Sequence, residues 1–354
     1  MSEEKSFDDQ PLTPSEAMEF LPIMIKARLP VMLTGSPGQG KSQIMQQVCQ
    51  LVEADLVTAH PVVDSAIDYK GFPCMIDIKP HGKSNAKATK EAVFLPFGDL
   101  KRLIDPEKLT VHFADDLGPA AKMVQAAYGQ LLENRAINGH KISDNVIFMA
   151  ATNRKKDKAG VQGIISMLLD RFYTVKELQN SLNDWSAHAN RCKMPHELIS
   201  WVRYRPQVLD AFKPTVDMSR TPTPRGLFQI GAMMQAGVPA SLQRKIFSGT
   251  IGKEWATEFI GWLRIYQDMP NPDHIVMNPK DGDIPTEPGH LYALCGALSA
   301  RATANTFERI ITYANRLKDE FSILLVKDAI NRDKKLCNCP AFLDWSLEHQ
   351  DILT

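Results

Sequence analysis

The stretch "VMLTGSPGQGKSQIMQQV", residues 31–48, decides the fold of this chain. An apolar run enters a glycine-rich turn, and a helical pattern that starts with a lysine and a serine follows it. Residues 35–42, "GSPGQGKS", match the pattern G-x-x-x-x-G-K-[ST], whose backbone N–H groups cradle phosphates. The pattern can occur by chance, but here it lies between a strand and an amphipathic helix, as its chemistry requires. The stretch therefore predicts a nucleotide-binding turn in an α/β fold.

The residue types of this turn each serve phosphate binding. Three glycines let the backbone wrap closely and point several N–H groups inward, and the positive end of the following helix adds to the attraction. Lys41 supplies a charge for the β- and γ-phosphates, and Ser42 offers a hydroxyl to Mg²⁺. We therefore expect ATP or ADP with Mg²⁺ as ligands. The residues expected to bind the nucleotide are Gly35, Ser36, Pro37, Gly38, Gln39, Gly40, Lys41 and Ser42.

Short, strongly apolar runs recur through the first half of the chain, separated by helical patterns. Runs without polar alternation are typical of strands that are buried on both faces, as in a parallel sheet covered by helices. The expected strands are residues 29–33, 55–60, 109–116, 146–153 and 172–178. This half therefore predicts a nucleotide-binding core with a parallel five-stranded sheet.

Two acidic residues and one amide lie at the ends of expected strands, where a phosphate site needs them. Asp115 ends an apolar run, and we expect it to hold Mg²⁺ together with Ser42. Asp116 comes next, in the position of a carboxylate that polarises the attacking water. Asn153 ends the fourth expected strand and is the candidate for orienting that water.

Two arginines are candidates for stabilising the charge on a transferred phosphoryl group. Arg171 precedes the fifth expected strand, and Arg225 begins a helical pattern farther along the chain. Such an arginine acts either in its own subunit or in the site of a neighbouring one. The sequence leaves open which of the two acts in which way.

The pattern changes to helices after about residue 180. We expect an α/β core in residues 1–180, an all-α lid domain in residues 181–268, and a proline-rich linker with a C-terminal helical extension in residues 269–354. The proline-rich stretch 269–289 suggests an extended connection. The apolar spacing over residues 307–325 predicts a helix.

Composition and charge limit the classes of function. The chain has 354 residues, with 41 Lys and Arg against 41 Asp and Glu, so bulk charge argues against nucleic acid as a partner. The six cysteines form no C-x-x-C pair, which favours reduced thiols over a zinc site. We expect no membrane span, because no long apolar run occurs, and no signal peptide at the polar N-terminus. These features together favour a cytoplasmic protein.

With these residues in hand, the chain resembles the AAA+ ATPases, and within them the MoxR-like family. The resemblance rests on "GSPGQGKS" as Walker A, "VHFADD" as Walker B, "AATN" as sensor 1, "LLDRF" as the arginine-finger segment and "SRTPTPRG" as sensor 2. Residues 65–104 resemble the insert in the second helix of that family, and "NGH" resembles the turn of the hairpin before sensor 1.

The resemblance implies an ATPase that forms a ring, usually a hexamer, with the nucleotide at subunit interfaces. Proteins of this family act as chaperone-like remodelers or activators of protein partners, often beside a protein with a von Willebrand factor A-like domain. By position, Asp116, Asn153, Arg171 and Arg225 match the family's catalytic residues, and Ser42 and Asp115 its metal ligands.

Asp116 departs from the family pattern, because that position usually holds a glutamate. Aspartate is one methylene shorter, so we expect slow hydrolysis. Two alternatives stay open: a nucleotide-gated scaffold with very slow hydrolysis, and a motor or loader that acts on nucleic acid. The first predicts that Asp116→Glu raises turnover sharply. The second predicts turnover stimulated by DNA or RNA.

Overall fold

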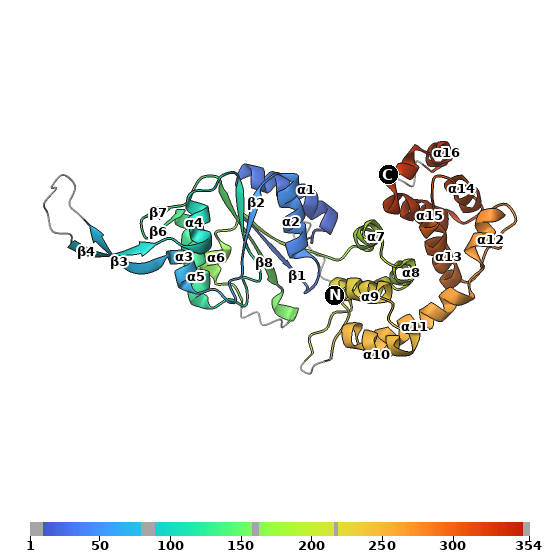
Figure 1. The fold of residues 1–354 in the computed structure, drawn as a ribbon, viewed down its shortest axis with the longest axis horizontal. Helices are drawn as coiled ribbons and strands as arrows, with labels where there is room; N and C mark the ends of the chain where they lie inside the picture. The colour runs from blue at the N-terminus through green and yellow to red at the C-terminus, as the bar shows by residue number, and fades with distance from the viewer. Residues whose placement is uncertain (1–9, 79–88, 158–162, 216–218, 350–354) are drawn as a thin grey trace, which may run out of the picture. The chain divides into compact units, whose positions relative to one another are not determined.

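The computed structural model describes residues 10–78, 89–157, 163–215 and 219–349 of the chain (Figure 1). The chain divides into two compact units, residues 1–179 and 180–354. The first unit contains a sheet covered by helices, and the second is built from helices.

All neighbouring strands of the central sheet are parallel, and the strand order is β2-β5-β8-β1-β9. Its strands are β1 (Val31–Gly35), β2 (Asp55–Ala59), β5 (Thr110–Ala114), β8 (Val146–Asn153) and β9 (Thr174–Glu177). Gly35 lies opposite Asn153 at the carboxyl ends of their strands, and Ala114 lies opposite Ala150. The loops after β1, β5 and β8 therefore meet at one edge of the sheet. From β1 the chain continues to β2 at one edge of the sheet, and from β8 it continues to β9 at the other edge. Ligands commonly bind at such a topological switch point in open α/β folds.

Strand β8 shows why these apolar runs form a sheet with two covered faces. Its alternate residues Val146, Phe148 and Ala150 belong to one buried cluster, and Ile147 and Met149 belong to another. The first cluster packs α5 (Lys122–Asn134) against the sheet, and the second packs α1 (Pro14–Ala27) and α2 (Lys41–Leu51). Each large apolar side chain buried in this way contributes about 1.5–3 kcal/mol.

Local signals set the ends of the helices that flank the sheet. Thr13 caps α1 in a reciprocal capping box with Glu16, and Arg28 ends it in the left-handed conformation with φ 60°. The Arg28 turn returns the chain directly into β1, so the helix positions the strand that carries the glycine-rich turn.

Two small hairpins extend the first unit. In the insert, β3 (Phe72–Ile78) pairs in antiparallel fashion with β4 (Thr89–Leu95), between α3 (Ala66–Lys70) and α4 (Gly98–Ile104). Farther along, β6 (Ala136–Ile137) pairs with β7 (His140–Lys141).

The second hairpin has the turn that its sequence "NGH" predicts. Asn138 has φ 48° and Gly139 has φ 83°, as a tight two-residue turn requires. Its side chains also hold the insert, because Asn138 Nδ2 donates to Lys70 O at 2.8 Å and His140 Nε2 lies 2.6 Å from Phe94 O.

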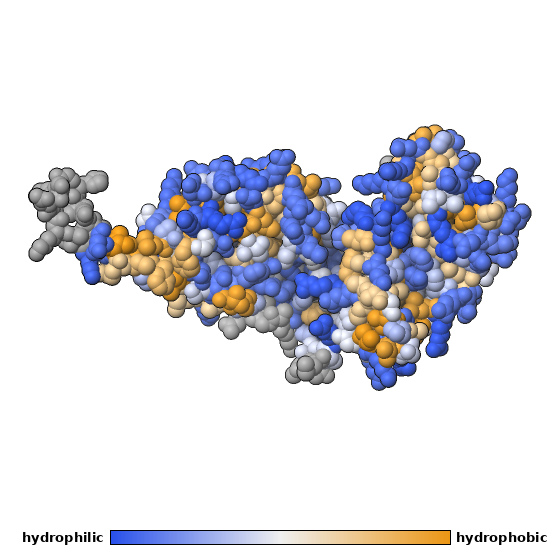
Figure 2. All heavy atoms as spheres, viewed as in Figure 1, coloured by the Kyte–Doolittle hydropathy of each residue, from blue (hydrophilic) through white to orange (hydrophobic). Residues whose placement is uncertain are grey.

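The β3–β4 hairpin leaves apolar side chains exposed. Figure 2 shows orange residues gathered where this hairpin joins the rest of the first unit. Phe72 is 53% exposed, and its cross-strand neighbour Leu95 is 42% exposed on the same face of the two-stranded sheet.

The second unit contains two buried clusters. Its α-helices are α7 (Leu182–Arg191), α8 (His196–Tyr204), α9 (Pro224–Gln235), α10 (Ala240–Ile251), α11 (Lys253–Asp268), α12 (Pro272–Met277), α13 (Pro288–Ala300), α14 (Phe307–Ala314), α15 (Asp319–Arg332) and α16 (Pro340–Glu348). Helix α13 joins the clusters, since Ala293 and Ala297 face one of them and Leu294 and Leu298 face the other.

Two segments of this unit differ from what the sequence suggests. The proline-rich stretch 269–289 includes α12, whose Ile275 and Val276 are buried, so this part is packed rather than extended. The helix expected over 307–325 is interrupted between α14 and α15. Arg316 lies in the interruption and donates to Pro279 O at 2.8 Å and to Gly282 O at 2.9 Å.

The predicted architecture is confirmed: an α/β core with a parallel five-stranded sheet, followed by a helical region that continues to the C-terminal part of the chain. The division of that region into a lid and an extension remains a prediction. Among the described residues, no helix combines the length and the apolar composition that crossing a membrane requires.

Candidate nucleotide-binding site

The glycine-rich turn joins β1 to α2 at the carboxyl edge of the sheet. Gly38 has φ 76° and Gly40 has φ 88°, a region in which a Cβ would be strained. Gly40 is also the N-cap of α2, and no side chain caps this helix start. Uncapped N–H groups at the start of a helix attract anions, so the turn has the local structure that the motif predicts.

Lys41 is buried in the turn, with 6% of its surface exposed. Its Nζ donates to the carbonyl oxygens of Gly35 and Ser36, each at 3.1 Å, and to Asn153 Oδ1 at 2.9 Å. These bonds hold the ammonium group between the glycine-rich turn and the end of β8.

Ser42 and Asp115 lie in direct contact. Ser42 Oγ donates to Asp115 Oδ2 at 2.6 Å. The backbone N of Asp115 donates to Ala59 O at 3.0 Å, and this bond holds Asp115 in place just after β5. A hydroxyl and a carboxylate are hard oxygen ligands of the kind that Mg²⁺ prefers. Among the described residues, no group of three or more His, Cys, Asp or Glu side chains is arranged to hold a metal ion. The pair therefore fits a Mg²⁺ that takes its remaining ligands from phosphate and water.

Asn153 links Lys41 to Asp116. While its Oδ1 accepts from Lys41, its Nδ2 donates to Asp116 Oδ1 at 3.2 Å. Asp116 has φ 55°, a left-handed conformation that aspartate tolerates better than most residues. The turn that carries it is held to β8, because Leu117 N donates to Ala151 O at 2.9 Å. The structure thus brings five predicted residues together at the sheet edge: Lys41, Ser42, Asp115, Asp116 and Asn153.

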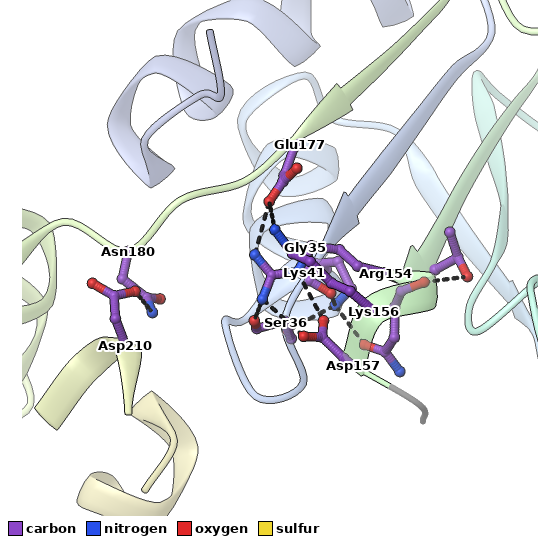
Figure 3. Close-up of polar contacts among 11 residues, drawn as sticks. Gly35, Ser36, Lys41, Arg154, Lys156, Asp157, Glu177, Asn180 and Asp210 are labelled. Carbon is purple, nitrogen blue, oxygen red and sulfur yellow. Dashed lines mark hydrogen bonds and ion pairs between the residues drawn. The ribbon is translucent and has the colours of Figure 1, made fainter. Parts of the chain in front are cut away.

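Arg154 is a further residue of this site, which sequence reasoning missed (Figure 3). Its guanidinium contacts Ser36 Oγ in the glycine-rich turn, and it forms two bonds to Asp157, at 2.8 Å and 2.9 Å, and one to Glu177 at 2.8 Å. The bond to Asp157 is the main reason why the pKa of Arg154 is raised. Arg154 therefore ties the turn to the ends of β8 and β9. The available signal was its position directly after Asn153.

The two predicted arginines lie elsewhere. Arg171 forms an ion pair with Glu133 on α5, and its side chain is 17% exposed. None of its described hydrogen bonds reaches the glycine-rich turn. Arg225 belongs to the second unit, where it is exposed in the first turn of α9. The roles of both arginines stay predictions.

Comparisons with known proteins give distant structural neighbours and no family. No protein-family model matches the chain. No curated protein matches it. A variant of RuvB from Thermotoga maritima is similar, with 16% identity over 88% of this chain and 90% of that chain and a TM-score of 0.41. RuvB of the same organism, described as a Holliday junction branch migration motor, has 14% identity over 85% and 87% and a TM-score of 0.38.

A third solved structure, from Cytophaga hutchinsonii, is named as a candidate ATPase. It has 12% identity over 90% of this chain and 81% of that chain, with a TM-score of 0.33. TM-scores below 0.5 at such identities support no conclusion about function.

Proposed function

We propose that this chain binds ATP with Mg²⁺ and hydrolyses it to ADP and phosphate. The observation that carries this proposal is the series of hydrogen bonds from Lys41 through Asn153 to Asp116, beside the contact of Ser42 with Asp115. Such an array holds donors and acceptors in place before the reaction, which is how enzymes stabilise charge that develops in a transition state.

The residues divide the work of phosphoryl transfer. Lys41 exchanges one of its bonds to a backbone carbonyl for an oxygen of the β- or γ-phosphate. Ser42 and Asp115 would hold Mg²⁺, which neutralises the charge that builds up on the phosphate oxygens. The backbone N–H groups of the turn and of the start of α2 bind the remaining phosphate oxygens.

Asn153 and Asp116 act on the attacking water. As the water oxygen bonds to the γ-phosphorus, the bond from that phosphorus to the bridging oxygen breaks. Asp116 accepts the proton that the water loses, and the Nδ2 of Asn153 keeps the carboxylate oriented. Because aspartate is shorter than glutamate, its distance to the water is the weak point of the array, and we expect slow turnover.

The Asp116 geometry also supports a second candidate, a nucleotide-gated scaffold with very slow hydrolysis. In that role ATP binding changes the conformation, and turnover only resets it. The variant Asp116→Glu separates the two. A sharp rise in turnover favours the scaffold, and an unchanged or lower rate favours the hydrolase.

We further propose that copies of this chain assemble into a hexameric ring and remodel a protein partner. The resemblance to MoxR-like proteins implies both the ring and a partner with a von Willebrand factor A-like domain. The support is indirect: Arg171 and Arg225 are candidates to complete the site of a neighbouring copy. Arg171 would have to leave Glu133 to do so. Native mass spectrometry with and without ATP tests the assembly.

Steady-state turnover of ATP tests the hydrolase itself. Lys41→Ala and Asp115→Ala should each reduce turnover by about 100-fold or more, since the first removes the ammonium group at the phosphates and the second removes the carboxylate proposed to hold Mg²⁺. Lys26→Ala, in the exposed part of α1, is the matched control and should leave turnover unchanged. Turnover that is unchanged in both site variants rules out this site as the centre of hydrolysis.

A further inference from the structure

Arg154 holds the hydroxyl of Ser36 in the glycine-rich turn, and two carboxylates fix its guanidinium group (Figure 3). Asp157 accepts one bond from Nε and one from Nη2, at 2.8 Å and 2.9 Å, and Glu177 accepts one from Nη1 at 2.8 Å. Because Asp157 is 5% exposed, its two bonds keep the planar group in one orientation. The direction of the N–H group that donates to Ser36 Oγ is therefore set before any ligand binds.

The charge of Arg154 is offset locally, so the residue acts on the turn through a directed bond. Its guanidinium faces the carboxylates of Asp157 and Glu177, and the latter also lies 3.8 Å from Lys156 Nζ. Arg154 is thus committed to protein partners and offers the glycine-rich turn no unpaired charge. Its described contact with the turn is the bond to Ser36 Oγ.

Ser36 is held at two points in the turn. Its Oγ accepts from Arg154, because a guanidinium group only donates, and its carbonyl oxygen accepts from Lys41 Nζ at 3.1 Å. In the reaction proposed above, Lys41 exchanges a bond to a backbone carbonyl for one to a phosphate oxygen. The bond from Arg154 is then the hold on Ser36 that does not depend on Lys41.

The glycine-rich turn needs such a hold, because glycine loses more conformational freedom on ordering than any other residue. Gly38 and Gly40 both have positive φ, and no side chain caps the helix that follows. A ligand that binds a flexible turn must supply the entropy of ordering it, whereas a turn that is already ordered spares the ligand that cost.

We propose that Arg154 is a positioning residue for nucleotide binding. Anchored by its two carboxylates, it holds the hydroxyl of Ser36 and so keeps the start of the glycine-rich turn in its phosphate-binding shape while the turn is empty. This inference rests on the proposed binding of MgATP and adds to it a residue outside the motif that sets the affinity.

Calorimetric titration of MgATP into the full-length chain tests the role with two variants. Ser36→Ala removes the hydroxyl and leaves the bonds of Arg154 to its carboxylates. Arg154→Lys keeps the charge, but one ammonium group cannot reproduce the planar fork that joins three partners. Each variant should weaken binding about tenfold, the cost of ordering roughly one residue. Ser241→Ala, at an exposed serine of α10, is the matched control and should bind like the unmodified chain.

The double variant and the kinetics separate positioning from a merely structural role. If Arg154 acts through Ser36, the double variant binds about tenfold more weakly, like each single variant, and not roughly 100-fold as independent effects would give. The loss should fall on KM, with kcat changed less than about threefold, because the bound phosphates hold the turn once the nucleotide is in place.

The proposal is overturned if Ser36→Ala binds MgATP like the unmodified chain, if the two changes multiply, or if kcat falls as far as the affinity does. Melting temperatures report whether the variants fold, and Ser36→Ala alone decides the question if Arg154→Lys does not fold. Failure of the unmodified chain to bind MgATP would overturn the proposed function, and this inference with it.

Discussion

The first unit contains two clusters of acidic residues, and they differ in how their charges are satisfied. At the sheet edge, Asp115 accepts from a hydroxyl, Asp116 from an amide, and Asp157 from a guanidinium in two bonds. On α4, Asp99 has a long ion pair with Arg102, and it is repelled by the charges of Asp64 and Asp68.

The difference between the clusters concerns preorganisation. At the sheet edge, the side chains hold one another in the geometry that phosphoryl transfer needs, so a ligand meets a formed site. On α4, Asp99 has a long and half-exposed ion pair, and its pKa is raised first by burial and also by the charges of Asp64 and Asp68. The two arginines, Arg154 and Arg102, allow a direct test of this contrast.

The largest effect should come from Arg154→Ala. This change leaves Asp157, which is 5% exposed, without its charged partner, and breaking a buried pair in this way costs about 3 kcal/mol. Arg102→Ala, at the exposed pair on α4, should cost less than about 1 kcal/mol. Urea unfolding of both variants measures the difference, and equal losses of stability would contradict the contrast.

The next effect is on catalysis. Asn153→Ala removes the acceptor of Lys41 and the donor to Asp116 together, and we expect turnover to fall about 100-fold, or roughly 2.7 kcal/mol in the barrier. Steady-state kinetics with excess MgATP measures it. As a control, Asn145→Ala, in the turn before β8, should retain turnover. A loss of tenfold or less would mean that Asn153 only supports the turn.

Burial of His112 predicts a pH dependence of stability. Its folded pKa of about 4 lies below the ordinary value of 6.5, so the unfolded chain binds more protons between these limits. Stability from the neutral ring is present above pH 6.5 and is lost as the pH falls toward 4.

The variant His112→Phe removes the titrating ring and with it this part of the pH dependence of stability. The ring should fit among its neighbours Tyr128 and Phe148. Between pH 7 and 5, the unmodified chain should lose roughly 2 kcal/mol more stability than the variant. Melting temperatures at the two pH values measure the difference, and parallel losses in both proteins would show that His112 does not titrate as proposed.

The smallest effect is expected at Asp99. Because the folded pKa of Asp99 is raised, its ionised form is disfavoured in the folded chain, and stability is lost as the pH rises through that pKa. Asp99→Asn should therefore raise stability at pH 7 by less than about 1 kcal/mol, given the exposure of the carboxylate. Differential scanning calorimetry measures it. A lower melting temperature would mean that the Arg102 pair outweighs the repulsion.

The sheet and the centre of the site could be predicted because local sequence determines them. A strand buried on both faces needs a continuous apolar run, and the glycine-rich turn needs its glycines, lysine and serine at set positions. Asp115 and Asn153 follow from the same logic, since residues at the carboxyl ends of neighbouring parallel strands meet at one edge.

Other features depend on partners that are distant in the sequence. Arg154 gains its role from Asp157 and from Glu177 at the end of β9, and no pattern around it shows that pairing. The break between α14 and α15 contains Arg316, which contacts carbonyl groups more than 30 residues away. The β3–β4 pair escaped prediction because its strands lack the buried apolar alternation that marks a strand.

The most direct test of the central claim is a calorimetric titration of MgADP and MgATP into the full-length chain. The account predicts saturable binding of one nucleotide per chain, lost in Lys41→Ala and kept in Lys26→Ala. Absence of binding heat from folded protein, or equal affinity in Lys41→Ala, would contradict it.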